Sequence, residues 1–260
     1  MTLFIGSLLA IGFQSPADAI VVRHDRDDSA FLALAQKYPA TARVRRASHP
    51  NEPGDGGTLV DPWWILTAAH VAANLGPGDL VDIGGGEHRI DLIVSYPEWH
   101  GDADFKVDIA LLRLSSPVTT VVPAQIYSGD DETGAVVSFA GYGGNGTGLT
   151  GPVQEDQKRR AATNRVELAQ GSILRFRFDA PQDVGVTDLE GISGPGDSGG
   201  PAYLERENTL YVVGVSSAQD SSPAGRKRGH YHVLEYYARV SYFVDWIRTA
   251  LDELAPDREP

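Results

Sequence analysis

The sequence predicts an all-β protein made of two packed antiparallel β-barrels, followed by one α-helix at the C-terminal end. Two groups of short β-like segments follow one another with no helical stretch between them. The 29 glycines and 16 prolines interrupt the chain too often for long helices. Near the end of the chain, Ser241–Leu254 places its apolar residues at helical spacing.

The first group of segments is predicted to form an N-terminal barrel over about residues 40–120. Clusters of Pro, Gly and Asp separate its five β-like runs, which are Thr58–Val60, Trp64–Leu66, Leu80–Ile83, Arg89–Val94 and Ile109–Leu114. Upstream of this group, the apolar pattern within Asp27–Pro39 predicts one short helix. The connection to the second barrel is expected near Ser115–Ala124.

The second group is predicted to form a C-terminal barrel over about residues 125–240. Its β-like runs are Val136–Ala140, Asn164–Leu168, Ile173–Phe178, Leu210–Val215 and Tyr237–Val240. Ile173–Phe178 alternates apolar and basic residues, so one face of that strand is expected to be buried. The helix over residues 241–254 is expected to pack its apolar face on this second barrel. A membrane-binding face is disfavoured, because the polar face of the helix carries acids and no lysine.

Composition narrows the class of protein. With 260 residues, 42% of them hydrophobic, the chain can bury a sizeable core. A formal net charge of −13 argues against a nucleic-acid partner. Because cysteine is absent, a disulfide, a thiol nucleophile and a cysteine-based zinc site are all excluded.

The first 19 residues have the pattern of a secretion signal. Met1–Ala19 contains a short apolar core followed by Ala17-Asp18-Ala19, an Ala-x-Ala cleavage site. The protein is therefore expected to be secreted or periplasmic, with one domain over residues 20–254; a buried strand or helix of the mature protein is the alternative for the leader. No later apolar run reaches the roughly 18 residues that a membrane span requires.

Three separate segments carry the residues of a nucleophilic site. Gly196-Asp197-Ser198-Gly199-Gly200-Pro201 places Ser198 in a glycine turn, which exposes the hydroxyl and aims neighbouring N–H groups at one point. A serine needs a base and a group that orients the base. His70, after the apolar run Trp63–Leu66, and Asp108, at the start of a β-like run, are the candidates.

These segments resemble the trypsin/chymotrypsin-like serine proteases, which carry T-A-A-H, D-I-A-L-L and G-D-S-G-G-P in this order. Here Asp108 follows His70 by 38 positions and Ser198 follows Asp108 by 90, and the similarity runs from about Ile20 to about Leu254. The resemblance implies two six-stranded barrels and a secreted serine endopeptidase that works through an acyl-enzyme, without metal or cofactor.

The resemblance also implies a role for each residue of the site. Ser198 would be the nucleophile, His70 the general base, and Asp108 the acid that orients the imidazole. The N–H groups of Gly196 and Ser198 would form the oxyanion hole. Cleavage after Ala19 would make Ile20 the new N-terminus, whose ammonium group would fold inward and pair with Asp197.

The substrate pocket departs from the trypsin-like pattern. Ile192, followed by Ser193, stands where trypsin-like members have an aspartate. Ser216 and Ser217 are expected in the far wall, and either of them is a candidate for contact with the buried acid. Glu235 falls near the pocket floor; it would restore a preference for cationic residues, fill the space, or point to solvent.

The absence of cysteine is a second departure. Asp55, Val71 and Gly194 stand where animal members of the family have disulfide-forming cysteines, so packing alone must hold this fold. The expected partners are a peptide or protein substrate and a protein inhibitor, and the expected state is a monomer.

Two alternative functions are compatible with some of the same residues. An α/β-hydrolase esterase also has G-x-S-x-G, but it needs a helix after the serine, and Gly199-Gly200-Pro201 is a poor helix start. Its histidine would follow the serine, which leaves only His230 or His232. The other alternative is a binding protein on the protease scaffold; such proteins lose a residue of the site, and none is lost here.

Overall fold

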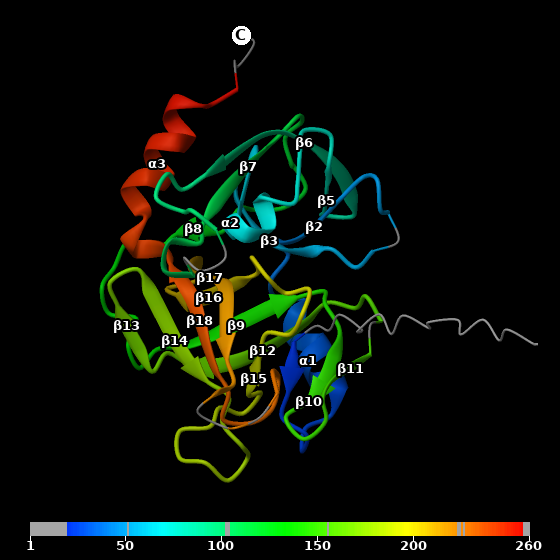
Figure 1. Ribbon diagram of the computed structural model, residues 1–260, viewed down its shortest axis with the longest axis vertical. Helices are drawn as coiled ribbons and strands as arrows, with labels where there is room; N and C mark the ends of the chain where they lie inside the picture. Colours follow the sequence, from blue (N-terminus) through cyan, green and yellow to red (C-terminus); the bar gives the residue numbers. More distant parts are fainter. Residues whose placement is uncertain are drawn as a thin grey trace, which may run out of the picture.

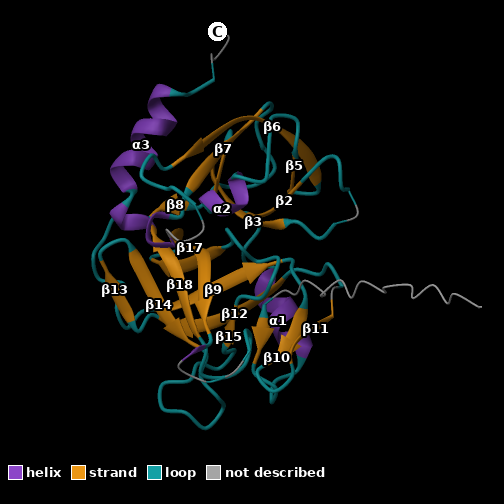
Figure 2. Cartoon of the chain, in the orientation of Figure 1, coloured by secondary structure: helices purple, strands orange, loops and turns teal. Residues whose placement is uncertain are grey.

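The chain folds into two stacked lobes with a helix along one side (Figure 1). The structure is a computed structural model that describes residues 20–50, 52–101, 105–154, 156–222, 225 and 227–256. The leader expected over residues 1–19 lies outside the described residues. Strands are the main regular structure of both lobes, and the helices are few and short (Figure 2).

The first lobe is a closed six-stranded barrel, as predicted. Its hydrogen-bonded order is β2-β3-β4-β7-β6-β5. The strands are β2 (Thr41–Arg45), β3 (Asp55–Asp61), β4 (Trp64–Thr67), β5 (Leu80–Ile83), β6 (Gly86–Ser95) and β7 (Ala110–Leu114). Inward-facing side chains such as Leu59, Ile65 and Leu112 are fully buried and fill the barrel.

The second lobe is a curved sheet of eight strands ordered β12-β9-β16-β17-β18-β14-β13, with β8 paired to β17. The strands are β8 (Gln125–Ile126), β9 (Val136–Gly141), β12 (Arg160–Arg165), β13 (Leu168–Gln170), β14 (Ile173–Arg177), β16 (Pro201–Arg206), β17 (Thr209–Asp220) and β18 (Leu234–Arg239). Within the described residues no backbone ladder joins β12 to β14, so the second lobe is a half-barrel, and the two-lobed, mostly β fold predicted from the sequence is confirmed. Nδ2 of Asn164 on β12 donates to the carbonyl of Arg177 on β14 at 3.1 Å.

A small third sheet lies beside the second lobe and was not predicted. Its order is β11 (Gly151–Gln154), β10 (Asn145–Thr147), β1 (Val21–Val22) and β15 (Gly191–Ile192). β1 pairs in parallel with β10 and antiparallel with β15. The start of the described chain is therefore fastened to β15, the strand that leads into the turn carrying Ser198.

Two of the helices fall where periodicity predicted them. α1 (Asp28–Ala35) lies inside residues 27–39 and is capped by Asp27, whose carboxylate accepts from the Ser29 N–H at 2.8 Å. α3 (Val244–Glu253) follows a 3₁₀ turn, η3 (Val240–Tyr242). The short α2 (Ala69–Ala72) and the 3₁₀ turn η1 (Phe105–Val107) lie in the first lobe.

The C-terminal helix, expected on the second lobe, also contacts the first. α3 reaches across to the first lobe, where Tyr96 packs edge-on against Phe243 and Trp246, at ring separations of 4.9 and 5.4 Å. Arg113 on β7 donates to the Leu254 carbonyl at the end of the helix. The apolar face is wide enough to cover residues of both lobes, so α3 acts as a strap between them (Figure 1).

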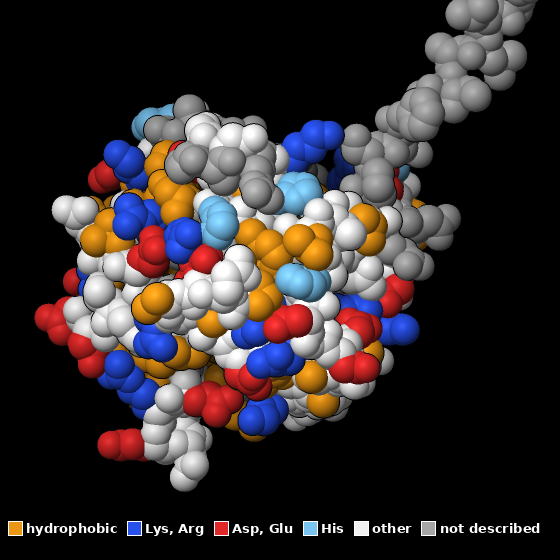
Figure 3. All heavy atoms as spheres, turned by 90° about the horizontal axis from the view of Figure 1, so that it is seen from below, with side chains coloured by type: hydrophobic (Ala, Val, Ile, Leu, Met, Phe, Trp, Pro, Cys, Tyr) orange, Lys and Arg blue, Asp and Glu red, His pale blue; other side chains and the backbone are white. Residues whose placement is uncertain are grey.

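The surface of the second lobe mixes charges of both signs. On the face drawn in Figure 3, acidic and basic side chains alternate instead of gathering by sign. None of the helices in the described ranges is long and apolar enough to cross a membrane.

Candidate active site

His70 lies just past the end of a buried strand and is held by an acid. β4 ends at Thr67, and α2 places His70 in its first turn, with the side chain about one quarter exposed. The His70 Nδ1 lies 2.7 Å from Asp108 Oδ2, and the backbone N–H of His70 donates to Asp108 Oδ1 at 2.8 Å. A carboxylate at Nδ1 holds the proton there, which leaves Nε2 as the basic nitrogen.

Asp108 is almost fully buried yet has several donors. It lies between η1 and β7, with 3% of its surface exposed. Besides the two donors of His70, the hydroxyl of Ser217 donates to Oδ2 at 2.5 Å. Since a buried carboxylate without donors would be costly, Ser217 and His70 together make this position stable for an anion. Ser217, and not Ser216, is therefore the serine that contacts the buried acid.

The Ser198 turn contains two positions whose backbone angles favour glycine. Gly196 has φ +88° and Gly199 has φ +75°, both in the left-handed region. Three hydrogen bonds fix the turn: Gly200 N–H to the Asp197 carbonyl, Gly199 N–H to the Ser216 carbonyl, both at 2.8 Å, and Gly56 N–H to the Ser198 carbonyl at 2.7 Å.

This turn lies against the residues that immediately precede His70. A Cβ on Gly199 would come 2.2 Å from Thr67 Oγ1 and 3.0 Å from the Ala68 nitrogen. The Thr67 hydroxyl in turn donates to the Gly56 carbonyl at 2.8 Å. The backbone of the second lobe therefore packs on the first lobe next to His70, with no room for a side chain between them.

The Ser198 hydroxyl is half-buried, in the turn that packs on the residues before His70. The structure thus brings together the His70–Asp108 pair and the Ser198 turn. Within the described ranges, the N–H groups of Gly196 and Ser198 donate to no protein acceptor. Both N–H groups remain available to bind an anionic oxygen.

Asp197 is buried beside the nucleophile and accepts from two neighbouring segments. Its Oδ2 accepts from the Gly194 N–H at 3.0 Å and its Oδ1 from the Gly143 N–H at 3.2 Å. Ile20, also buried, leads directly into β1, which is paired with β15.

A small cavity of about 50 Å³ opens beside Ser198. Its lining combines small side chains and a few polar groups: Ser193, Gly194, Pro195, Ser198, Ser216, Ser217, Ala218, Gln219, Arg228 and Glu235. Four of the five residues expected to form a substrate pocket line this cavity. Ile192 does not, because its side chain packs in a core cluster with Val21 and Phe178.

Glu235 is fully buried at this cavity and is held by its neighbours. Its carboxyl accepts from the Ser193 N–H at 3.1 Å and from the Ser193 hydroxyl. Burial raises the pKa of Glu235 to about 8, against the opposing effect of the hydrogen bonds from Ser193 and Gln219. At neutral pH the carboxyl is therefore mostly protonated, so Glu235 adds little negative charge to a lining that also contains Arg228.

Sequence reasoning missed two residues of the site. Gln219 donates from Nε2 to the Ser193 carbonyl and so supports the segment that holds Glu235. Asp55 lies near His70. Burial raises the pKa of Asp55, and the charge of the His70 ring offsets this rise only in part. Neither residue belongs to a recognisable motif, and the bulge in β17 between Ser216 and Ala218 shifts the register that would have placed Gln219.

Comparison with known families agrees with this geometry. The family model described as Trypsin matches residues 32–247, most of the chain, so this protein belongs to the trypsin family. The family is one of serine-type endopeptidases.

We predict that a methyl group at Gly199 separates the two lobes at the site. Gly199→Ala combines an unfavourable φ of about 1–2 kcal/mol with overpacking of about 1–3 kcal/mol against Thr67. Urea denaturation should show a loss of about 2–5 kcal/mol in the free energy of unfolding. Gly134→Ala is the matched control, since Gly134 has φ +85° and no atom near its Cβ position. Equal losses for the two variants would contradict the tight contact.

Proposed function

We propose that this protein is a secreted serine endopeptidase that cleaves peptide bonds through an acyl-enzyme on Ser198. The observation that carries the proposal is the His70–Asp108 pair, at 2.7 Å, beside a glycine turn whose backbone packs on Thr67 and Ala68. Imidazole suits a general base near neutral pH, and its buried carboxylate partner orients it and stabilises the imidazolium.

In the proposed reaction, Ser198, His70 and the two oxyanion-binding N–H groups each act once in acylation and once in deacylation. His70 Nε2 takes the proton of the Ser198 hydroxyl as Oγ attacks the scissile carbonyl carbon, and the N–H groups of Gly196 and Ser198 hold the oxyanion. His70 then gives that proton to the leaving amine, and water repeats the sequence to release the acid. The hydrogen bond from the Ser198 hydroxyl to His70 Nε2 is expected to be short and well aligned with substrate bound, since such bonds often tighten only in that complex.

The esterase alternative loses support from the local fold. An α/β-hydrolase requires a helix directly after its nucleophile. In this protein the Ser198 turn continues into the strand β16 instead.

We predict that removal of the Ser198 hydroxyl abolishes turnover without loss of folding. Ser198→Ala should lower kcat on a peptide substrate by roughly 10⁴–10⁶-fold. His70→Ala should cost a similar factor, and the double variant little more, because the two residues act as one unit. Steady-state kinetics and labelling by a fluorophosphonate provide the measurements. Losses that multiply in the double variant, or a folded wild-type protein that is not labelled, would contradict the mechanism.

The cavity beside Ser198 supports a preference for small uncharged residues at the cleaved position. A volume of about 50 Å³ leaves room for only a few water-sized groups, which favours a small side chain over an aromatic ring or an extended cation. The protonated Glu235 occupies the floor, where it fills space and offers no charge. We therefore propose that Glu235 limits the size of the accepted side chain at neutral pH.

We predict that the wild-type protein cleaves after Ala or Ser at least about tenfold faster, by kcat/KM, than after Phe or Arg at pH 7. Glu235→Gly should enlarge the cavity and shift the preference to larger residues, while the isosteric Glu235→Gln should keep it. Above pH 8 the wild-type carboxyl ionises, so the rate for Lys relative to Ala should rise, and it should stay constant in Glu235→Gln. A strong preference for Arg or Lys at pH 7 would exclude this role.

We also propose that export and activation are one event. Removal of residues 1–19 would leave the ammonium group of Ile20 at the buried end of β1, where it needs a buried anion, and Asp197 is the candidate. An ion pair there would hold the turn that carries Gly196 and Ser198.

We predict that mass spectrometry of the exported protein gives Ile20 as the first residue. A recombinant form with one extra alanine before Ile20 should fold and yet lose most of its turnover, because the added residue displaces the ammonium group. A mature start well downstream of Ile20, or full activity of the extended form, would refute the proposal.

A further inference from the structure

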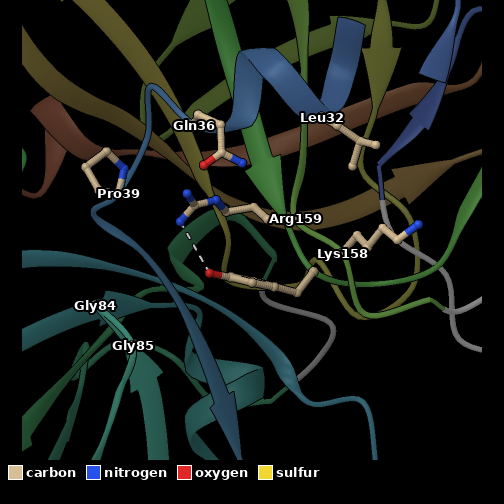
Figure 4. A pocket seen from close by; sticks show the side chains of 8 residues that line it. Leu32, Gln36, Pro39, Gly84, Gly85, Lys158 and Arg159 are labelled. Carbon is tan, nitrogen blue, oxygen red and sulfur yellow. Dashed lines mark hydrogen bonds between the residues drawn. The ribbon is translucent and has the colours of Figure 1, made fainter. Parts of the chain in front are cut away.

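A second, larger cavity lies away from the Ser198 cavity, where three segments of the chain meet. Its volume is about 610 Å³, within the range that holds small organic ligands or part of a peptide. The lining comes from α1 and the turn after it, from the turn between β5 and β6, and from the segments next to β9 and β12. The residues are Leu32, Gln36, Pro39, Gly84, Gly85, Tyr142, Lys158 and Arg159 (Figure 4).

The charged residues of this lining are both cations. Lys158 and Arg159 are adjacent in sequence, and no acid belongs to the lining. In a protein with a formal net charge of −13, a cavity with two cations and no anion creates a local positive field. Such a field favours an anionic ligand.

Arg159 is incompletely paired, in contrast to its neighbour. Arg160 donates to both Asp28 and Asp156, with each acid accepting two hydrogen bonds at 2.6–2.9 Å. Arg159 donates to the Tyr142 hydroxyl at 3.3 Å, and its Nε, which is buried, has no partner among the described residues. The guanidinium group therefore carries a charge that no described acid neutralises through an ion pair.

Lys158 is held only weakly. Its Nζ lies 3.6 Å from Asp156 Oδ2, and its side chain is 61% exposed. Since Asp156 already accepts both Arg160 bonds, this exposed contact leaves most of the donor capacity of Lys158 unused. In Figure 4 the Lys158 side chain points away from the Arg159 guanidinium, so its ammonium group adds positive charge to the surroundings of the cavity without facing Arg159.

The neutral groups of the lining suit the same kind of ligand. In Figure 4 the side chain of Gln36 points from α1 toward the Arg159 guanidinium, and the dashed line joins Arg159 to Tyr142. Leu32 and Pro39 provide apolar surface on the α1 side. A planar carboxylate matches the edge of a guanidinium group, and an amide donor such as Gln36 adds to its recognition.

We propose that this cavity is a binding site for a carboxylate group, with Arg159 as its principal partner and Lys158 as a second cation. The carboxylate has two sources, a free small dicarboxylate or an Asp or Glu side chain of a peptide. The site does not depend on the proposed peptidase activity, since none of its lining residues belongs to the His70, Asp108 and Ser198 set.

Binding is tested directly by isothermal titration calorimetry on the full chain carrying Ser198→Ala, which prevents cleavage of the probes. The probes are glutarate, its neutral analogue glutaramide, and the blocked peptide acetyl-Gly-Glu-Gly-Glu-Gly-amide. We expect glutarate or the peptide to bind, glutaramide to bind at least tenfold more weakly, and salt to weaken the binding. Binding of glutarate alone indicates a free carboxylate as the ligand, and binding of the peptide alone indicates a protein side chain.

Variants separate this cavity from general charge effects. Arg159→Gln should weaken binding by about tenfold or more, and Lys158→Gln by a smaller factor. Arg165→Gln is the matched control, because Arg165 is an exposed arginine on β12 outside the cavity and should leave binding unchanged. Equal affinity for glutarate and glutaramide, an unchanged affinity in Arg159→Gln, or no binding of either carboxylate probe would overturn the proposal.

Discussion

The site depends on one contact, called the seam below, in which the backbone of Gly56 meets the backbone of the Ser198–Gly200 turn without a side chain between them. Gly56 of the first lobe donates to the carbonyl of Ser198, and a Cβ on Gly56 would lie 2.6 Å from the Gly200 Cα. Thr67 closes the seam by donating to Gly56. Because glycine backbones meet there with no side chain between them, the serine turn has a single position relative to His70. Preorganised geometry of this kind is what nucleophilic catalysis requires, since a displacement of 1 Å at such a site is costly.

Buried acids are the second recurring theme, and each one is stabilised in its own way. Donors surround Asp108 and Asp197, which suits an anion. Burial opposes the ionisation of Glu132, but the hydrogen bonds from Arg239 and Ser241 outweigh it and hold its pKa below the usual value. Glu190 and Glu235 are the opposite case, since burial raises their pKa to about 7 and about 8. A chain without cysteine therefore relies on packing and on these satisfied carboxyl groups.

The sequence predicted what short-range pattern encodes. Five of the six strands of the first barrel, α1 and the segments around His70, Asp108 and Ser198 follow from periodicity or motif, whereas β2 was not predicted. The third sheet was missed because its strands have two to four residues and pair across long separations, as Val21 does with Gly146. The orientation of Ile192 could not be predicted from the sequence either. Its side chain packs in a core cluster, and Glu235, 43 positions later, lines the cavity instead. The position of α3 depends on which lobe offers aromatic partners, and Tyr96 lies far from it in sequence.

The strap formed by α3 has a consequence for how this molecule is assembled. α3 follows the second lobe along the chain, yet its Phe243 and Trp246 contact Tyr96 of the first lobe. The first lobe therefore completes its apolar packing only when a segment from beyond the second lobe packs on it, which couples the folding of the two lobes. A chain without α3 would leave apolar surface of its first lobe uncovered and open to association with other chains.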